Sequence, residues 1–218
     1  MSHFALRGLY AIVDVTDAAG AGRLIDAALQ ALAGGAALVQ YRNKGGDAQQ
    51  RTAQARLLLD ACNRYHVPLL INDDTELALE VGAHGVHIGQ QDTPLALARE
   101  RLGADAIIGV SCNNRYELAV AAAKSGANYI AFGRFFASRT KPEAPQAEME
   151  LIARAKLELQ VPIAVIGGIT LDNAPALLEA GADMLAVIHG LFGSQGIEAT
   201  ARRFVQLIQS QKIRQGTA

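Results

Sequence analysis

Carboxylates and amides directly follow short apolar runs in this sequence. The stretch VPLLINDD passes from five apolar or Pro residues straight into Asn72, Asp73 and Asp74. Later, the run HIGQQD ends in Asp92. A pair of carboxylates beside a phosphate group suits a magnesium ion, which prefers oxygen ligands and keeps several waters. The same pair also suits general acid–base catalysis, and an Asp at a strand-to-helix turn suits helix capping, the role that we expect for Asp74.

Cationic side chains follow another apolar run. In VQYRNK, residues Gln40, Arg42 and Lys44 alternate along the chain. Their side chains therefore share one side of an extended segment. Two fixed positive charges and an amide suit an anionic substrate.

Hydroxyls, a further lysine and glycines occur in later segments. The long stretch FGRFFASRTKPEAP contains Ser138, Thr140 and Lys141, which suit phosphate oxygens on a loop that can act as a lid. The stretch IGGIT supplies Gly167 and Gly168, where the backbone can approach an anion closely. In GVSCNN, Ser111 offers a hydroxyl and Asn113 an amide, but neither has a base beside it in the sequence, so we do not predict a nucleophilic serine.

These segments follow eight short apolar stretches that we predict to be strands, each followed by a helix-like stretch. The predicted strands are Leu9–Asp14, Ala37–Arg42, Leu69–Asn72, Gly85–Ile88, Ile107–Ser111, Tyr129–Gly133, Ile163–Ile166 and Met184–Ile188. The segment DTPLALARERLG illustrates the helices: Thr93 suits the cap, Pro94 the first helical position and Gly103 the end.

A repeat organises these elements. The stretches GGAALVQ, GAHGVHIG, GANYIAFG and GADMLAVIHG each place Gly-Ala, or a close variant, before an even-numbered strand. A strand-helix-strand-helix unit used four times predicts a (β/α)8 TIM barrel of eight parallel strands with outer helices. An open doubly wound sheet would more often carry G-x-G-x-x-G after its first strand, and AIVDVTDAAGAG does not supply it there. We expect a single domain over residues 1–218, with a loose tail after Gln211.

In such a barrel all strands end at one face, and that face carries the chemistry. We therefore expect the polar segments to meet there. Gly167, Gly168 and the VIHG turn would form a monophosphate cradle, since the ends of strands seven and eight are a recurrent phosphate site. Across the mouth, the cationic residues and the two acids would form a larger anion site. This arrangement indicates two phosphorylated substrates.

Composition narrows the class of protein. Half of the 218 residues are apolar, and 20 basic against 21 acidic residues leave no basic footprint of a nucleic-acid binder. The start has no secretory signal pattern, and no apolar run approaches the ~18 residues of a membrane span. The two cysteines, Cys62 and Cys112, form no metal or disulfide pattern. We expect a cytoplasmic enzyme with small-molecule substrates; a homo-oligomer is compatible with the sequence.

Taken in order, the motifs GLYAIVD, VQYRNK, INDDTELALEVGAHGVHIGQQD, IIGVSCNN, FGRFFASRTKP, VPIAVIGGITLDN and GADMLAVIHG resemble the thiamine phosphate synthase (thiamine-phosphate pyrophosphorylase) family. The resemblance implies a transferase that joins 4-amino-2-methyl-5-(diphosphooxymethyl)pyrimidine to a thiazole phosphate, forming thiamine phosphate and diphosphate.

The resemblance also implies residue roles. Gln40, Arg42, Lys44, Asn72, Ser111 and Lys141 would bind the pyrimidine diphosphate, with Gln40 on the pyrimidine ring. Asp73 and Asp92 would ligate Mg2+. Ser138, Arg139 and Thr140 would meet the thiazole phosphate, whose cradle Gly168, Ile188 and His189 would complete. Magnesium and the catalytic cations Arg42, Lys44 and Lys141 would stabilise the departing diphosphate in an ionisation followed by capture, which needs no strong base.

Four positions depart from the family pattern. Asp74 stands where Arg is usual, Ser138 where Thr is usual, His189 where Ser is usual, and Asn43 where an acidic residue is usual. Ser138 keeps the hydroxyl. His189 adds bulk near the phosphate, and Asp74 removes a positive charge near the diphosphate.

Two alternatives remain open at this stage. A related thiazole tautomerase shares the fold but uses a histidine after strand five, where Asn113 stands here, and lacks the magnesium-binding acids; His189 could supply the missing base. A non-catalytic barrel that binds a thiamine precursor is the other, because a fold alone does not define an activity. An aldolase-like barrel would need a Schiff-base lysine on a strand, and the predicted strand cores contain none.

Overall fold

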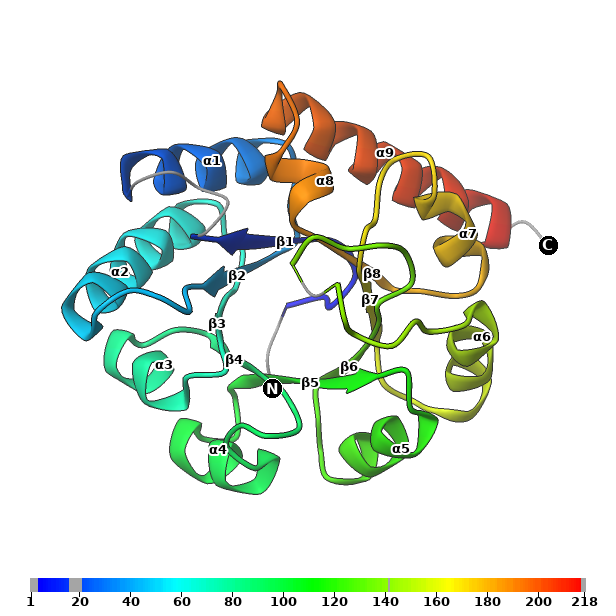
Figure 1. The fold of residues 1–218 in the computed structure, drawn as a ribbon, viewed down its shortest axis with the longest axis horizontal. Helices are drawn as coiled ribbons and strands as arrows, with labels where there is room; N and C mark the ends of the chain where they lie inside the picture. The colour runs from blue at the N-terminus through cyan, green and yellow to red at the C-terminus, as the bar shows by residue number, and fades with distance from the viewer. Residues whose placement is uncertain (1–3, 16–20, 141, 217–218) are drawn as a thin grey trace.

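Eight parallel strands close into a barrel in which each strand pairs with the next along the chain and β8 pairs with β1 (Figure 1). The structure is a computed structural model that describes residues 4–15, 21–140 and 142–216. The strands are β1 (Gly8–Asp14), β2 (Leu38–Arg42), β3 (Leu69–Asn72), β4 (Gly85–Ile88), β5 (Ile107–Asn113), β6 (Tyr129–Phe132), β7 (Ile163–Ile166) and β8 (Met184–Val187). The predicted (β/α)8 barrel is confirmed.

Helices surround the barrel on the outside (Figure 1). They are α1 (Ala21–Ala33), α2 (Ala48–Arg64), α3 (Thr75–Val81), α4 (Leu95–Leu102), α5 (Tyr116–Lys124), α6 (Met149–Glu158), α7 (Ala174–Glu179), α8 (His189–Phe192) and α9 (Ile197–Gly216). The tail after Gln211, which we expected to be loose, is helical as far as Gly216. Within the described residues, no helix has the length and hydropathy that crossing a bilayer requires.

The strand predictions match the structure to within one or two residues at each end. The cap predicted for α4 is wrong: the helix begins at Leu95, Pro94 is its N-cap residue, and no side chain caps it. Pro94 has an extended ψ of 141°, so it lies outside the helix rather than in its first turn. Gly103 ends the helix with a positive φ, as expected.

Successive side chains along each strand point to opposite faces of the barrel wall and so form two apolar layers, one outside the wall and one inside it. Leu9, Ala11 and Val13 of β1 pack outward in the layer between the barrel and its helices. Tyr10 and Ile12 point into the barrel, where they join inward residues of the other strands in a separate cluster. The barrel interior is therefore a packed core below its mouth, which leaves only the strand ends for a site.

The Gly-Ala repeat has a structural explanation at the amino end of the barrel. Its glycine ends a helix with a positive φ, 94° at Gly35, 71° at Gly82, 86° at Gly126 and 107° at Gly181. The following alanine donates its N–H back to a carbonyl in the last turns of that helix (Ala36 to Ala31, Ala83 to Ala78, Ala127 to Ala122, Ala182 to Leu177). This is a Schellman-type ending, in which glycine tolerates the left-handed backbone.

The third residue of the repeat ties neighbouring strands together. His84, Asn128 and Asp183 each bond twice to one residue of the preceding strand. Their N–H groups donate to the carbonyls of Leu69 (3.0 Å), Ile108 (2.8 Å) and Ile163 (2.9 Å). Their side chains accept from the N–H groups of the same residues at 3.1, 2.8 and 3.0 Å. In the first repeat Ala37 makes only the backbone bond, to Leu9 at 2.8 Å, because alanine has no acceptor.

Candidate active site

A cavity of about 570 Å³ occupies the mouth of the barrel at the carboxyl ends of the strands. Its lining includes the predicted residues Gln40, Arg42, Lys44, Asn72, Asp73, Asp92, Ser111, Ser138, Arg139, Thr140, Gly168, Ile188 and His189. Lys141, which we also predicted, lies outside the described residues. The barrel thus brings together residues that are far apart in the sequence.

Asp73 reaches the cavity through an unusual backbone conformation. Its φ of 63° is left-handed, which is uncommon for a residue other than glycine. Its N–H donates to the carbonyl of His87 on β4 at 2.8 Å. The next N–H, that of Asp74, turns back to the carbonyl of Asn72 at 2.8 Å. These bonds fix the turn that separates the side chains of Asp73 and Asp74.

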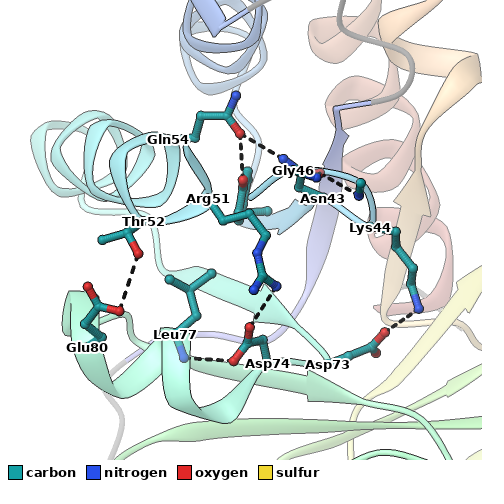
Figure 2. A network of polar contacts seen from close by, with 12 residues as sticks. Asn43, Lys44, Gly46, Arg51, Thr52, Gln54, Asp73, Asp74, Leu77 and Glu80 are labelled. Carbon is teal, nitrogen blue, oxygen red and sulfur yellow. Dashed lines mark hydrogen bonds and ion pairs between the residues drawn. The ribbon is translucent and has the colours of Figure 1, made fainter. Parts of the chain in front are cut away.

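Asp74 is directed away from the cavity, toward α2 and α3 (Figure 2). One carboxylate oxygen accepts from the N–H of Leu77 at 2.9 Å, which confirms the predicted helix cap. The other accepts from the guanidinium of Arg51 at 3.0 Å. Asp74, one of the positions that depart from the family pattern, therefore connects α2 to the first turn of α3. It is not among the residues that line the cavity.

Asn43, the second departure, shapes the turn after β2. Its side-chain oxygen accepts from the N–H groups of Gly45 at 3.0 Å and Gly46 at 2.9 Å (Figure 2). Its amide nitrogen donates to Gln54 at 3.1 Å. The turn positions Lys44, whose ammonium lies 2.7 Å from the Asp73 carboxylate.

Asp73 and Asp92 form a carboxylate pair. Burial opposes the ionisation of Asp73, but hydrogen bonds from Lys44 and Asp92 outweigh it, so the pKa of Asp73 is lowered. Burial and the neighbouring Asp73 carboxylate raise the pKa of Asp92, although the Gly89 N–H donates to Asp92 at 2.7 Å. Two acids this close repel each other when both are ionised, which is the electrostatic condition for holding a cation.

The donor set fits magnesium better than a metal that needs a full protein cage. Among the described residues, no group of three or more His, Cys, Asp or Glu side chains could hold a metal ion. Magnesium, by contrast, is commonly bound by one or two carboxylates together with waters and substrate phosphates.

Arg42 pairs with Asp14, a residue that we did not predict from the sequence to belong to the site. Its guanidinium donates to Asp14, at the end of β1, and the Asp14 side chain has no exposed surface. A buried carboxylate beneath the cation fixes the direction in which Arg42 faces the cavity. The signal was present in the sequence, because GLYAIVD ends a predicted strand with an acid.

The floor of the cavity combines apolar side chains with uncharged polar groups. Ile12, Ala131 and Ala186 line it from three strands, together with Tyr10 and His87, which sequence reasoning also missed. Gln40, with 2% of its surface exposed, is the most buried of the side-chain amides that line it. An uncharged ring therefore fits the floor, while phosphate groups fit the charged rim.

The loop after β6 forms the opposite wall. The N–H groups of Phe135 and Phe136 donate to the carbonyls of Ile166 (3.2 Å) and Gly167 (3.0 Å), so the loop lies on the turn after β7. Gly168 has a φ of 63°, and a Cβ there would lie 2.2 Å from the carbonyl oxygen of Ala137. Glycine is thus required for this contact, which brings Ser138, Arg139 and Thr140 to the cavity.

Arg134 braces the same loop from within. Its guanidinium donates to the carbonyls of Ala144 at 2.8 Å and Pro142 at 3.1 Å. The carbonyl of Arg134 accepts from the N–H of Ala147 at 2.8 Å. That this loop acts as a lid stays a prediction.

The turn after β8 completes this wall. Gly190 lies so close to the preceding turn that a Cβ would come within 2.1 Å of the Ile169 carbonyl oxygen. His189 is exposed, and its ring lies along Gly193, where a Cβ would be 2.6 Å from Cε1. Because residue 193 is a glycine, the imidazole of His189 has space beside α8.

Fold and cavity together define a (β/α)8 barrel with its polar site at the carboxyl ends of the strands. The family model for thiamine monophosphate synthase matches residues 9–191, and the chain belongs to this family of transferases. It is 51% identical over 203 residues, covering 93% of this chain and 95% of the relative, to a thiamine-phosphate synthase of Methylobacillus flagellatus.

Solved structures agree. A thiamine phosphate pyrophosphorylase from Pyrococcus furiosus superposes with a TM-score of 0.86 at 27% identity, covering 94% of this chain and 97% of that one. A geranylgeranylglyceryl phosphate synthase from Thermoplasma acidophilum, with a TM-score of 0.72 at 16% identity and 94% coverage of each chain, shares the fold alone.

Proposed function

We propose that this chain condenses 4-amino-2-methyl-5-(diphosphooxymethyl)pyrimidine with a thiazole phosphate, giving thiamine phosphate and diphosphate. One observation carries the proposal: a single cavity holds a cation-and-acid wall and, opposite it, a glycine and hydroxyl wall. Two walls of this kind suit a diphosphate and a monophosphate. The names of the family and of the two closely matching relatives support the same reaction.

The diphosphate would lie against β2, β3 and β4. Arg42, Lys44, Asn72 and Ser111, which line the cavity, would bind its oxygens together with Lys141. Negative charge grows on the diphosphate as its bond to the pyrimidine carbon breaks, so preorganised cations lower the barrier. The Asp14 carboxylate beneath Arg42 supports this role, since it holds one cation in place beforehand.

Asp73 and Asp92 would hold Mg2+, with water and diphosphate oxygens as the remaining ligands. When bound, the ion neutralises the leaving group as a Lewis acid. The Lys44 ammonium, 2.7 Å from Asp73, is within reach of this region and would bind diphosphate oxygens.

The thiazole phosphate would occupy the other wall. Ser138, Arg139 and Thr140 would supply side-chain donors, and Gly168, Ile188 and His189 would supply mainly backbone N–H groups. The thiazole nitrogen would then attack the exocyclic pyrimidine carbon. The apolar side chains Ile12, Ala131 and Ala186 would limit water near that carbon, which would favour capture by thiazole over hydrolysis.

The alternatives are less well supported. A tautomerase needs a base where Asn113 lines the cavity, and an amide cannot take up a proton at neutral pH. A precursor sensor has no need of two acids beside Lys44. We propose a cytoplasmic location, which suits two free, buried cysteines.

The test is product formation by the purified protein given both substrates. We expect thiamine phosphate and diphosphate in equal amounts with magnesium, none with EDTA, and recovery when magnesium is restored. Absence of product from folded protein under all three conditions would refute the proposal. Binding of the thiazole phosphate without turnover would then favour a sensor.

A further inference from the structure

A chain of hydrogen bonds crosses the floor of the cavity. Gln40 donates from Nε2 to the hydroxyl of Tyr10. The Tyr10 hydroxyl lies 2.9 Å from that of Tyr129, which lies 2.8 Å from Nδ1 of His87. Tyr10 and Tyr129 are 1% and 0% exposed, so water does not compete for these bonds.

The Gln40 amide, which donates to Tyr10, sets the direction of the chain, in which Nδ1 of His87 accepts as the Nε2–H tautomer. Each tyrosine hydroxyl has one proton to donate. Because Gln40 donates to Tyr10, the Tyr10 proton goes to Tyr129, and the Tyr129 proton goes to Nδ1 of His87. Burial raises the pKa of both tyrosines, so both keep the proton that this order requires. In this order each hydroxyl proton has an acceptor while Nε2 of Gln40 faces Tyr10.

Packing holds the chain in place. The rings of Tyr10 and Tyr129 meet edge to face at 5.9 Å, and those of His87 and Tyr129 stack at 5.5 Å. Gly109 makes room for Tyr129, since a Cβ there would lie 2.0 Å from its Cζ. This packing holds both tyrosine rings, and with them both hydroxyl oxygens, in place.

We propose that Tyr10 and Tyr129 are positioning residues that fix Gln40 with Oε1 toward the cavity, so that the floor accepts an amino-substituted pyrimidine and rejects its oxo analogue. The inference rests on the proposed function and takes the uncharged pyrimidine ring to lie on this floor beside Gln40. An exocyclic amino group donates to an amide oxygen, whereas an oxo group at the same position is an acceptor and opposes it.

Removing one hydroxyl from the chain tests this idea without changing the shape of the floor. In Tyr129→Phe the Tyr10 hydroxyl loses its acceptor, and its proton can turn to Gln40. The amide then gains from rotating, which puts Nε2 toward the cavity, where it suits an oxo group. Tyr10→Phe removes the acceptor of Nε2 directly and frees the amide in the same way.

The experiment compares kcat/KM for the aminopyrimidine diphosphate and for its 4-oxo analogue. The two substrates differ in intrinsic reactivity, but that difference is the same in every variant and cancels when ratios are compared. We expect Tyr129→Phe and Tyr10→Phe to lower the amino-to-oxo ratio by about tenfold or more, the effect of one buried hydrogen bond. KM for the thiazole phosphate should not change.

Tyr41→Phe is the matched control. The Tyr41 hydroxyl is equally buried and donates to Gln54 at 2.7 Å, but in the layer between β2 and α2. It should lose a buried bond and keep the wild-type ratio. An unchanged ratio in folded Tyr129→Phe and Tyr10→Phe, or an equal fall in Tyr41→Phe, overturns the inference. Failure of the proposed function would differ, because the wild type itself would then make no product.

Discussion

The two ends of the barrel differ in how much their residues vary from strand to strand. At the amino end, His84, Asn128 and Asp183 differ in chemistry but make the same pair of bonds to the preceding strand. At the carboxyl end, consecutive strands finish in different polar groups that converge on one cavity. The repeated end joins the strands, and the varied end is where substrates can be distinguished.

The fourfold Gly-Ala repeat at the amino end therefore does not require the active site at the carboxyl end to be fourfold symmetric. A strand joint needs only an acceptor at the right place, which an imidazole, an amide or a carboxylate supplies. A site needs particular charges at particular strands. Substitutions at the two ends should therefore separate stability from turnover.

The largest effect is expected from Asp73→Ala. Losing one of two acids should abolish magnesium-dependent turnover, a loss of at least about a hundredfold for a group that stabilises a transition state. The melting temperature should change little, because the Asp73 side chain pairs only with a half-exposed lysine. Steady-state assays and thermal melts check both statements. Retained activity with normal magnesium dependence would rule out the carboxylate pair as the metal site.

Asp183→Ala should show the reverse pattern. It leaves the buried N–H of Ile163 without an acceptor and breaks the pair with Lys156, for a cost of about 1–3 kcal/mol in unfolding free energy. Asp183→Asn should recover most of that loss, since Asn128 makes the equivalent bond. Denaturant titration measures both, and kcat should be unchanged. A loss of kcat without a loss of stability would break the comparison.

Asp74 should affect both stability and turnover, since it caps α3 directly beside the Asp73 turn. Asp74→Ala should cost about 1 kcal/mol through the lost cap. By loosening the Asp73 backbone it should also raise, by a few fold, the magnesium concentration for half-maximal turnover. Asp74→Asn keeps a capping oxygen and should lie between the wild type and Asp74→Ala. Magnesium titrations of activity, run beside melts, would expose a purely structural role if only stability changed.

The smallest expected effect is a pH dependence of stability at His84, whose side chain bonds to the N–H of Leu69 on the preceding strand. Burial lowers the pKa of His84, so the folded protein favours the neutral ring while the unfolded chain takes up a proton below about pH 6.5. This contribution to stability is complete above that pH and is lost as the pH falls toward the lower folded value. The difference in unfolding free energy between the wild type and His84→Asn, which cannot titrate, should therefore shrink or reverse on acidification. A pH-independent difference would argue against this coupling.

Much of this arrangement could be predicted from the sequence. The Gly-Ala repeat and the short apolar runs gave the barrel and its strands, because helix endings and strand length leave local signals. Gln40, Arg42, Asp73 and Asp92 were identifiable because each follows an apolar run at a strand end. The Asp74 cap was likewise a local feature.

Other features depend on distant partners. Tyr10 and Tyr129 look like ordinary core residues in the sequence, and only the closed barrel brings their hydroxyls to 2.9 Å. Asp14 gained its role from Arg42, which lies on the next strand. Thr93 was a plausible cap by composition, but the extended Pro94 starts the helix one residue later than predicted.

The most direct test of the central claim is calorimetric titration of Mg2+ into the protein with saturating inorganic diphosphate. The account predicts binding by the wild type that Asp73→Asn and Asp92→Asn each weaken by about tenfold or more, because a neutral amide replaces a charged ligand. Asp183→Asn, at the other end of the barrel, should bind as the wild type does. Equal magnesium affinity in the wild type and both cavity variants would contradict the account.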